Sequence, residues 1–192
     1  AEKAKIGYVG AFPYAEVKSG YTSFFLGARS VCPTVTMEVV YTNSWFDIAL
    51  EKEGALKLIN DGCVLISQHA DSEGAPKACE EAGVPNVAYN VDTTNLGPNT
   101  ALISSKINWE PYFEMTIKCV ASGKAIPTDW CGTLKTGSVQ LTALNEKAAA
   151  EGTQKAIDDA KAQLEAGTLK VFDTKNFKVD GKELATYLAD VK

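Results

Sequence analysis

Hydrophobic positions along the chain alternate between short continuous apolar runs and longer stretches in which apolar residues recur every three or four positions. Continuous runs bounded by turn residues are typical of buried strands, whereas the three-to-four spacing is typical of helices with one buried face. The pattern predicts strands at 5–12, 36–42, 63–67, 86–90, 101–107 and 137–144, and helices at 15–30, 47–60, 75–82, 110–122 and 146–166.

The order of these elements predicts the architecture. Strands that alternate with helices form βαβ units with right-handed crossovers, so we expect an α/β fold with a mainly parallel sheet between two helical layers. The last residues carry short alternating runs around a VDG turn, which predicts a small hairpin or an extended arm. We therefore divide the chain into an α/β lobe, 1–145, and a segment, 146–192, with a long helix and this hairpin or arm.

Composition narrows the class of protein. The 192 residues are 45% apolar and 22% charged, which is enough for a substantial core. The net charge of −5 is spread without acidic or basic blocks, so no nucleic-acid partner is expected. No apolar run approaches the roughly 18 residues that span a bilayer, and residues 1–10 lack a signal-peptide core. We expect any export signal to have been removed or to lie outside this chain.

The five cysteines do not form a metal site in this interpretation. They include no C-x-x-C pair, and the single histidine, His69, cannot complete a zinc set. Five buried thiols are the favoured interpretation, and one or two disulfides with a remaining thiol are the alternative for an exported protein. The cysteines are Cys32, Cys63, Cys79, Cys119 and Cys131.

Candidate ligand contacts lie in the loops that follow the predicted strands. In an open parallel sheet, ligands bind beyond the carboxyl ends of the strands. These loops are rich in aromatic, amide and carboxylate side chains, which suit a flat small molecule with polar edges. The candidates are Phe12, Trp45, Phe46, His69, Asp71, Asn90 and Trp109.

Most of these candidates also have a structural alternative. Aromatic residues between a strand and a helix often fill a core, and Asp and Asn often cap helices or hold turns. In these alternatives Trp45 and Phe46 plug the strand–helix junction, Phe12 packs beneath its helix, His69 is a hydrogen-bonded loop residue, Asp71 caps the next helix and Asn90 holds a left-handed turn.

Motifs of catalysis are missing from the sequence. Gly7 and Gly10 are followed by Pro13 without the third glycine of a dinucleotide fingerprint, and neither a phosphate-binding loop nor a G-x-S-x-G elbow occurs. Any serine or cysteine nucleophile would have to recruit His69. The sequence therefore predicts a protein that is not an enzyme and has no cofactor or metal.

Four segments of the chain carry a resemblance to a known family. The segments IGYVGAFPYAEV, YTNSWFDIALEKEGALKLINDG, QHADSEGAPKACEEAGV and VFDTKNFKVDGK together resemble the basic membrane protein family. These are exported solute-binding lipoproteins that include purine nucleoside receptors of ABC transporters. The resemblance implies a type I periplasmic-binding-protein fold, in which two α/β lobes close on a purine nucleoside or base, with a permease as partner and a lipid anchor at the cell surface.

Family members are normally much longer than this chain. The KIGYVG strand resembles the start of their second lobe, so the chain resembles mainly the C-terminal lobe. In the family the chain crosses back to the first lobe near its end, which would leave the helix at 146–166 with an exposed apolar face. We therefore expect pairing with an N-terminal lobe or the formation of a homo-oligomer.

The resemblance also implies roles for individual residues. The family aromatic that stacks on the base corresponds to Trp45, and Phe46 replaces a residue that is often glycine. Asn90 stands where the family has an aspartate, and because an amide both donates and accepts, this change favours a free base or another ligand over strict recognition of nucleoside hydroxyls. Lys106 is near a family lysine but out of its register. In this scheme Asn90, Asp71 and His69 contact the ligand edges, and Phe12 and Trp109 line the cleft. An interaction module on the same fold and a small α/β enzyme remain the alternatives.

Overall fold

The structure, a computed structural model, describes residues 3–172, 178–179 and 182–183. Its main sheet has the strand order β2-β1-β3-β4-β5-β6. The first five strands are parallel, and β6 runs antiparallel to β5. The strands are β1 (Lys5–Gly10), β2 (Thr36–Tyr41), β3 (Ile66–Gln68), β4 (Asn86–Asn90), β5 (Ala101–Ile107) and β6 (Val139–Leu141).

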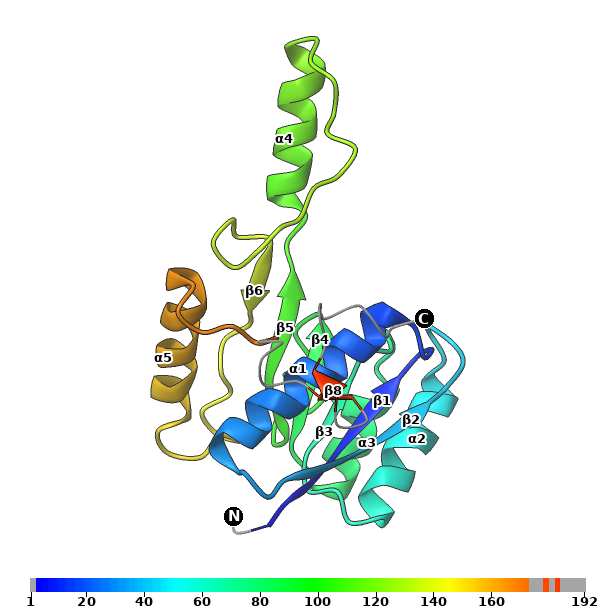
Figure 1. The fold of residues 1–192 in the computed structure, drawn as a ribbon. Helices are drawn as coiled ribbons and strands as arrows, with labels where there is room; N and C mark the ends of the chain where they lie inside the picture. Colours follow the sequence, from blue (N-terminus) through cyan, green and yellow to red (C-terminus); the bar gives the residue numbers. More distant parts are fainter. Residues whose placement is uncertain (1–2, 173–177, 180–181, 184–192) are drawn as a thin grey trace.

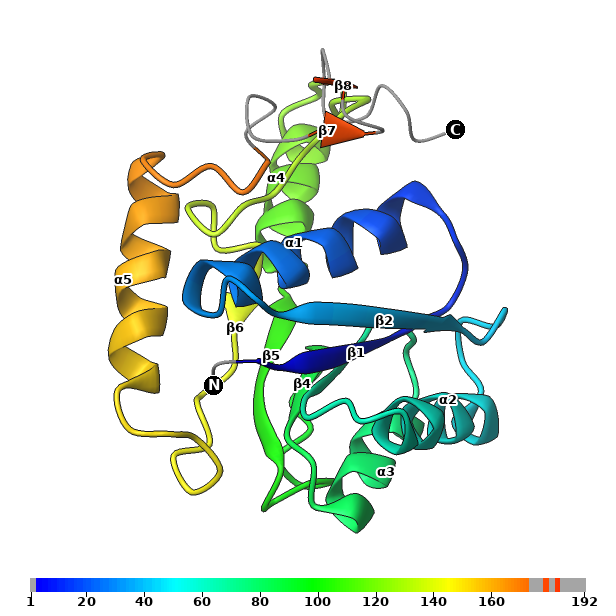
Figure 2. The same cartoon turned by 60° about the horizontal axis from the view of Figure 1, so that its bottom comes forward.

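Helices cover both faces of this sheet. Helix α1 (Ala15–Val31) crosses one face, and α2 (Ile48–Asn60) and α3 (Gly74–Ala82) pack on the other, as Figures 1 and 2 show. The α/β class, the mainly parallel sheet and the layered arrangement are therefore confirmed.

The hydrophobic core lies between the sheet and the α2–α3 layer. Val9, Leu58 and Ile66 are fully buried there, and each such side chain contributes roughly 1.5–3 kcal/mol through burial. A Cβ at Gly7 would lie 3.0 Å from the Cβ and Cδ1 atoms of Leu58, so glycine at this position allows α2 to lie close to β1. The two helices of this layer also meet closely, since a Cβ at Gly74 would lie 2.3 Å from the carbonyl oxygen of Ile48.

The opposite face is packed differently. Helix α1 buries only Val17, and aromatic rings fill the space between this helix and β1. The ring of Tyr8 lies 5.8 Å from that of Tyr21 and 6.0 Å from that of Phe24. This layer is therefore built from large rings rather than from the small side chains that line α3.

Several predicted boundaries were wrong. The strand expected at 63–67 is β3, Ile66–Gln68, because the amide of Cys63 still bonds to the carbonyl of Leu58 at the end of α2. The strand expected at 137–144 is only Val139–Leu141. The helix expected from 146 is α5 (Thr153–Ala166), because Gly152, with φ of 82°, interrupts the helical backbone before it.

The helix α4 (Glu110–Ala121) projects away from the sheet in Figure 1. Three apolar side chains along it are exposed: Phe113 by 56%, Ile117 by 67% and Val120 by 68%. Within α5, all of which the structure describes, Ile157 and Leu164 are half-buried. No residue of α5 is fully buried, so the expectation of an exposed apolar face on the helix at 146–166 stays a prediction, and α4 exposes an apolar face as well.

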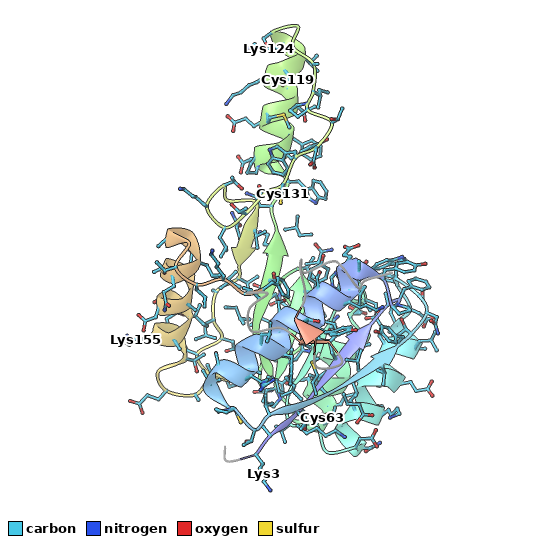
Figure 3. The ribbon with its side chains drawn as sticks, in the orientation of Figure 1. Lys3, Cys63, Cys119, Lys124, Cys131 and Lys155 are labelled. Atoms are coloured by element: carbon cyan, nitrogen blue, oxygen red, sulfur yellow. The ribbon has the colours of Figure 1, made fainter. Side chains whose placement is uncertain are left out.

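The thiols do not share one environment. Cys63 and Cys79 are buried, Cys32 and Cys119 are half-buried, and Cys131 is exposed. Figure 3 shows Cys119 on the projecting helix and Cys131 on the segment that returns from it, both away from the core that holds Cys63. The prediction of five buried thiols was therefore wrong for three of them.

The C-terminal hairpin is confirmed in part. Strands β7 (Lys178–Val179) and β8 (Lys182–Glu183) form an antiparallel pair. The rest of the predicted hairpin or arm, 173–177, 180–181 and 184–192, lies outside the described residues. The division into 1–145 and 146–192 stays a prediction.

Candidate functional site

The loops after β1, β2 and β3 meet at the carboxyl edge of the sheet. Strand β1 lies between β2 and β3, so the chain order reverses beside it, and such a switch point is where open α/β sheets receive ligands. Backbone hydrogen bonds join the loops: the amide of Asn43 donates to the carbonyl of Ala11, and that of Asp71 to the carbonyl of Trp45, both over 2.8 Å. The three loops therefore form one connected rim.

Aromatic rings gather on this rim. Phe12 stacks on Tyr14, with centroids 5.1 Å apart and an interplanar angle of 10°. The ring of Trp45 lies 5.5 Å from Phe12 and 6.2 Å from Tyr14, and Trp45 remains 36% exposed. Two predicted residues are thus brought together, and Tyr14 is an addition that its place between a strand and a helix could have indicated. Among the described residues, Phe46 joins no ring pair, and it is largely exposed.

His69 lies buried at the switch point. Its amide donates to the carbonyl of Val9, and its ring lies 4.3 Å from that of Tyr89, with only 5% of the residue exposed. Neither ring nitrogen has a hydrogen-bond partner among the described residues, and the 3.7 Å from Nε2 to the Oε1 atom of Glu16 is too long for one. The alternative of a hydrogen-bonded loop histidine is therefore contradicted.

The surroundings of His69 disfavour protonation of its ring. Burial lowers the pKa of His69, although the carboxylates of Glu16 and Asp71 act in the opposite direction. Helix α1 closes over the ring, because a Cβ at Gly20 would lie 2.6 Å from the Nδ1 atom of His69. A neutral imidazole has one donor and one acceptor nitrogen, and here both nitrogens lie buried beneath α1.

The Asp71 side chain does not cap α3. The capping position belongs to Glu73, whose side chain makes no capping hydrogen bond, and the amide of Gly74 donates instead to the Oγ atom of Ser72 over 3.1 Å. Among the described residues, the carboxylate of Asp71 makes no hydrogen bond or ion pair, and it is exposed on the same rim as Trp45. The capping alternative for Asp71 was therefore wrong.

Asn90 lies in a separate polar hollow. Its φ of 73° confirms the left-handed turn. Asn90, Lys106 and Gln140 are register partners across β4, β5 and β6, and they line a hollow of about 420 Å³. Side chains in register point to the same face of a sheet, so the three polar groups can act on one ligand.

Trp109 belongs to a second aromatic group. It lies at the start of α4, with its ring 6.1 Å from that of Tyr112 and 6.2 Å from that of Phe113. No ring pair among the described residues joins this group to the Trp45 rim. The structure thus places the seven candidates in distinct settings: the rim, the buried switch point, the hollow and the base of α4.

No described helix combines the length and apolar character needed to cross a bilayer. No group of three or more His, Cys, Asp or Glu side chains among the described residues is arranged to hold a metal ion.

The fold is that of periplasmic solute-binding proteins. It superposes on an ABC transporter solute-binding protein from Conexibacter woesei with a TM-score of 0.70 at 20% identity, covering 88% of this chain and 58% of that one. A transcriptional activator of the comK gene from Bacillus halodurans gives a TM-score of 0.72 at 19% identity, covering 86% and 57%.

Residues 1–171 match the ABC transporter substrate-binding protein PnrA-like family, Bmp, and the chain belongs to that family. It is 32% identical over 184 residues to a purine-binding protein of Brucella abortus, covering 95% of this chain and 52% of that protein. It is 37% identical over 140 residues to a provisionally named ABC transporter glucose-binding protein of Haloferax volcanii, covering 73% and 36%. The chain therefore spans about half the length of the first relative and about a third of the length of the second. The resemblance to the basic membrane protein family is confirmed.

Proposed function

We propose that this chain is one ligand-binding lobe of the solute-binding component of an ABC uptake transporter, and that its ligand is a purine base or nucleoside. The observation that supports this best is the rim of Phe12, Tyr14 and Trp45 at the carboxyl ends of β1 and β2. Phe12 and Tyr14 stack on each other, and the ring of Trp45, tilted by 56° and 50° to them, remains partly exposed at the same edge. Purines bind to exposed aromatic rings by stacking. The likeness to a purine-binding protein supports the same ligand class.

Polar groups around the rim suit the edges of a purine. In this proposal Asp71 presents its exposed carboxylate to the ligand, and His69, whose ring lies buried beneath α1, acts from behind the rim. Asn90 supplies an amide from the neighbouring hollow. Because an amide serves either donor or acceptor edges, Asn90 favours a free base over strict recognition of ribose hydroxyls. Trp109 and Phe46 complete the proposed lining at its borders.

The cellular setting follows from the family and is part of the proposal. Solute-binding proteins of ABC uptake systems deliver small molecules to a permease, so we propose an exported protein, periplasmic or at the cell surface and lipid-anchored in its full-length form, with a permease and a first lobe as partners. The family consists of solute-binding proteins rather than enzymes.

Calorimetric titration of the chain with adenine, adenosine and glucose tests the ligand class. A single lobe encloses only part of a small ligand, so we expect weak purine binding. Trp45→Ala should abolish the measurable purine heat, whereas Trp130→Ala, which removes a ring at the base of α4, should retain it. Binding of glucose in place of purines would assign the sugar ligand suggested by the second relative. Binding of neither, also when both lobes are present, would favour an interaction module.

A further inference from the structure

Glu51 is a charged side chain with none of its surface exposed. It lies in the first turn of α2, where a Cβ at Gly74 of α3 would come within 3.0 Å of its own Cβ. Burying a carboxylate costs free energy unless its oxygens accept hydrogen bonds. We therefore expect donors around Glu51 between the two packed helices.

The carboxylate of Glu51 is stabilised by backbone amides. The amide of Ser72 donates to both carboxylate oxygens, over 3.0 and 3.2 Å, and the amide of Asp47 donates to Oε1 over 3.4 Å. No cation forms an ion pair with Glu51 among the described residues. The Asp47 amide lies at the N-cap of α2 and the Ser72 amide directly before the N-cap of α3, where the helix dipoles favour a negative charge.

These bonds join two loops that the sheet does not join. Strands β2 and β3 are separated by β1, so no strand pairing fixes the loop after β2 relative to the loop after β3. Asp47 closes the first of these loops, two residues after Trp45, and Ser72 directly follows Asp71 in the second. One buried carboxylate thus spans the gap between them, beside the single backbone bond from the Asp71 amide to the Trp45 carbonyl.

We infer that Glu51 is a positioning residue of the ligand site, which holds the ring of Trp45 and the carboxylate of Asp71 at a fixed separation on the rim. The inference rests on the proposed function, since it assigns a task to a residue that does not itself touch a ligand. An apolar residue at this position would fill the same space, but it could not accept the Asp47 and Ser72 amides. Both loops would then lose their shared acceptor, and the site would lose its geometry before the fold loses its core.

Fluorine NMR of the chain labelled with 5-fluorotryptophan tests this inference. The chain has three tryptophans, so three resonances are expected, and Trp45→Phe identifies that of Trp45 by its loss. Glu51→Ala should shift or broaden the Trp45 resonance and leave those of Trp109 and Trp130 in place. It should also weaken purine binding roughly tenfold or more, the size expected when a buried hydrogen-bond acceptor is removed. Glu51→Gln keeps one acceptor oxygen and should give a smaller change of the same kind.

Glu80→Gln is the matched control. The Glu80 carboxylate also fixes a loop, since it accepts hydrogen bonds from Asn99 and from the Oγ1 atom of Thr100, but this loop precedes β5 rather than the rim. The control should lower stability without moving the Trp45 resonance. An unmoved Trp45 resonance in both Glu51 variants, or equal shifts of all three resonances, would overturn the inference. If Glu51→Ala does not fold, the Trp45 resonance of Glu51→Gln alone tests the inference. If the parent chain binds no purine, the proposed function fails, whereas the NMR comparison still decides the role of Glu51.

Discussion

At the scale of single residues, His69 combines deep burial with two unpaired ring nitrogens. Buried polar groups without partners are rare in proteins, and those that persist are often found where a ligand or an ordered water completes them. His69 lies at the switch point of the sheet, close to Tyr89 and Glu16. Its environment should therefore be measurable through its protonation.

The pKa of His69 should lie below its ordinary value of 6.5, because burial disfavours the charged ring. The unfolded chain then takes up a proton before the folded chain does, so stability should fall as the pH drops below about 6.5. NMR titration of the ring protons gives the pKa directly, since the chain has a single histidine. Glu16→Gln should lower the pKa further by removing a favourable charge, and a His69 pKa at or above 6.5 would contradict the predicted burial.

Glu51 should show the opposite dependence on pH. Burial raises the pKa of its carboxyl group above the ordinary 4.5, and the negative charge of Asp71 adds to this effect. Folding therefore disfavours the ionised form, and the stability that Glu51 contributes is present at low pH and is lost as the pH rises through the raised pKa. Urea unfolding between about pH 4 and pH 8 should show the parent chain losing stability relative to Glu51→Gln. A constant difference across this range would mean that the pKa of Glu51 is not raised.

At the scale of elements, two helical glycines should respond oppositely to the same substitution. A Cβ at Gly74 would lie 2.3 Å from the Ile48 carbonyl oxygen and 2.9 Å from the Lys52 amide, and neither backbone atom can move without shifting α2. Gly74→Ala should therefore lower the free energy of unfolding by about 1–3 kcal/mol. Gly27 in α1 has open space around it, so Gly27→Ala should raise the free energy of unfolding by about 0.5–1 kcal/mol. Denaturant unfolding of both variants tests the pair, and equal effects would contradict the close α2–α3 contact.

Sequence reasoning located most elements because their signals are local. A helix was expected over 47–60, and α2 begins at Ile48 because Asp47 caps it, with its Oδ1 atom accepting the Leu50 amide over 2.9 Å. The start of α5 was missed because the alanines at 148–150 favour helix, whereas Gly152 imposes a left-handed backbone that ends the local pattern. The candidate rim was predictable from strand ends, but the burial of His69 was not. It depends on α1 closing over the ring at Gly20, which is a contact between distant segments.

At the scale of the whole molecule, the sequence could not tell that α4 exposes an apolar face. Helix α4 has apolar residues at Phe113, Ile117 and Val120, and α5 has a comparable spacing at Ile157 and Leu164. Both patterns predict an amphipathic helix, and only the tertiary arrangement shows that α4 extends away from the sheet and leaves these side chains exposed (Figure 1). The exposed face of α4 is therefore the surface on which association should depend.

The face of α4 should promote self-association of this chain in solution. Exposed apolar stripes of this kind are usually covered in the assembled protein, by another domain or by a second copy. Sedimentation equilibrium at increasing concentration should show dimers for the parent chain and a shift to monomers for Ile117→Lys. The free energy of unfolding of this variant should change by no more than about 0.5 kcal/mol, because Ile117 is largely exposed within one chain. Val64→Lys, at an exposed position preceding β3, is the control and should leave the dimer intact. A parent chain that stays monomeric at high concentration would contradict self-association and leave the α4 face for pairing with a first lobe.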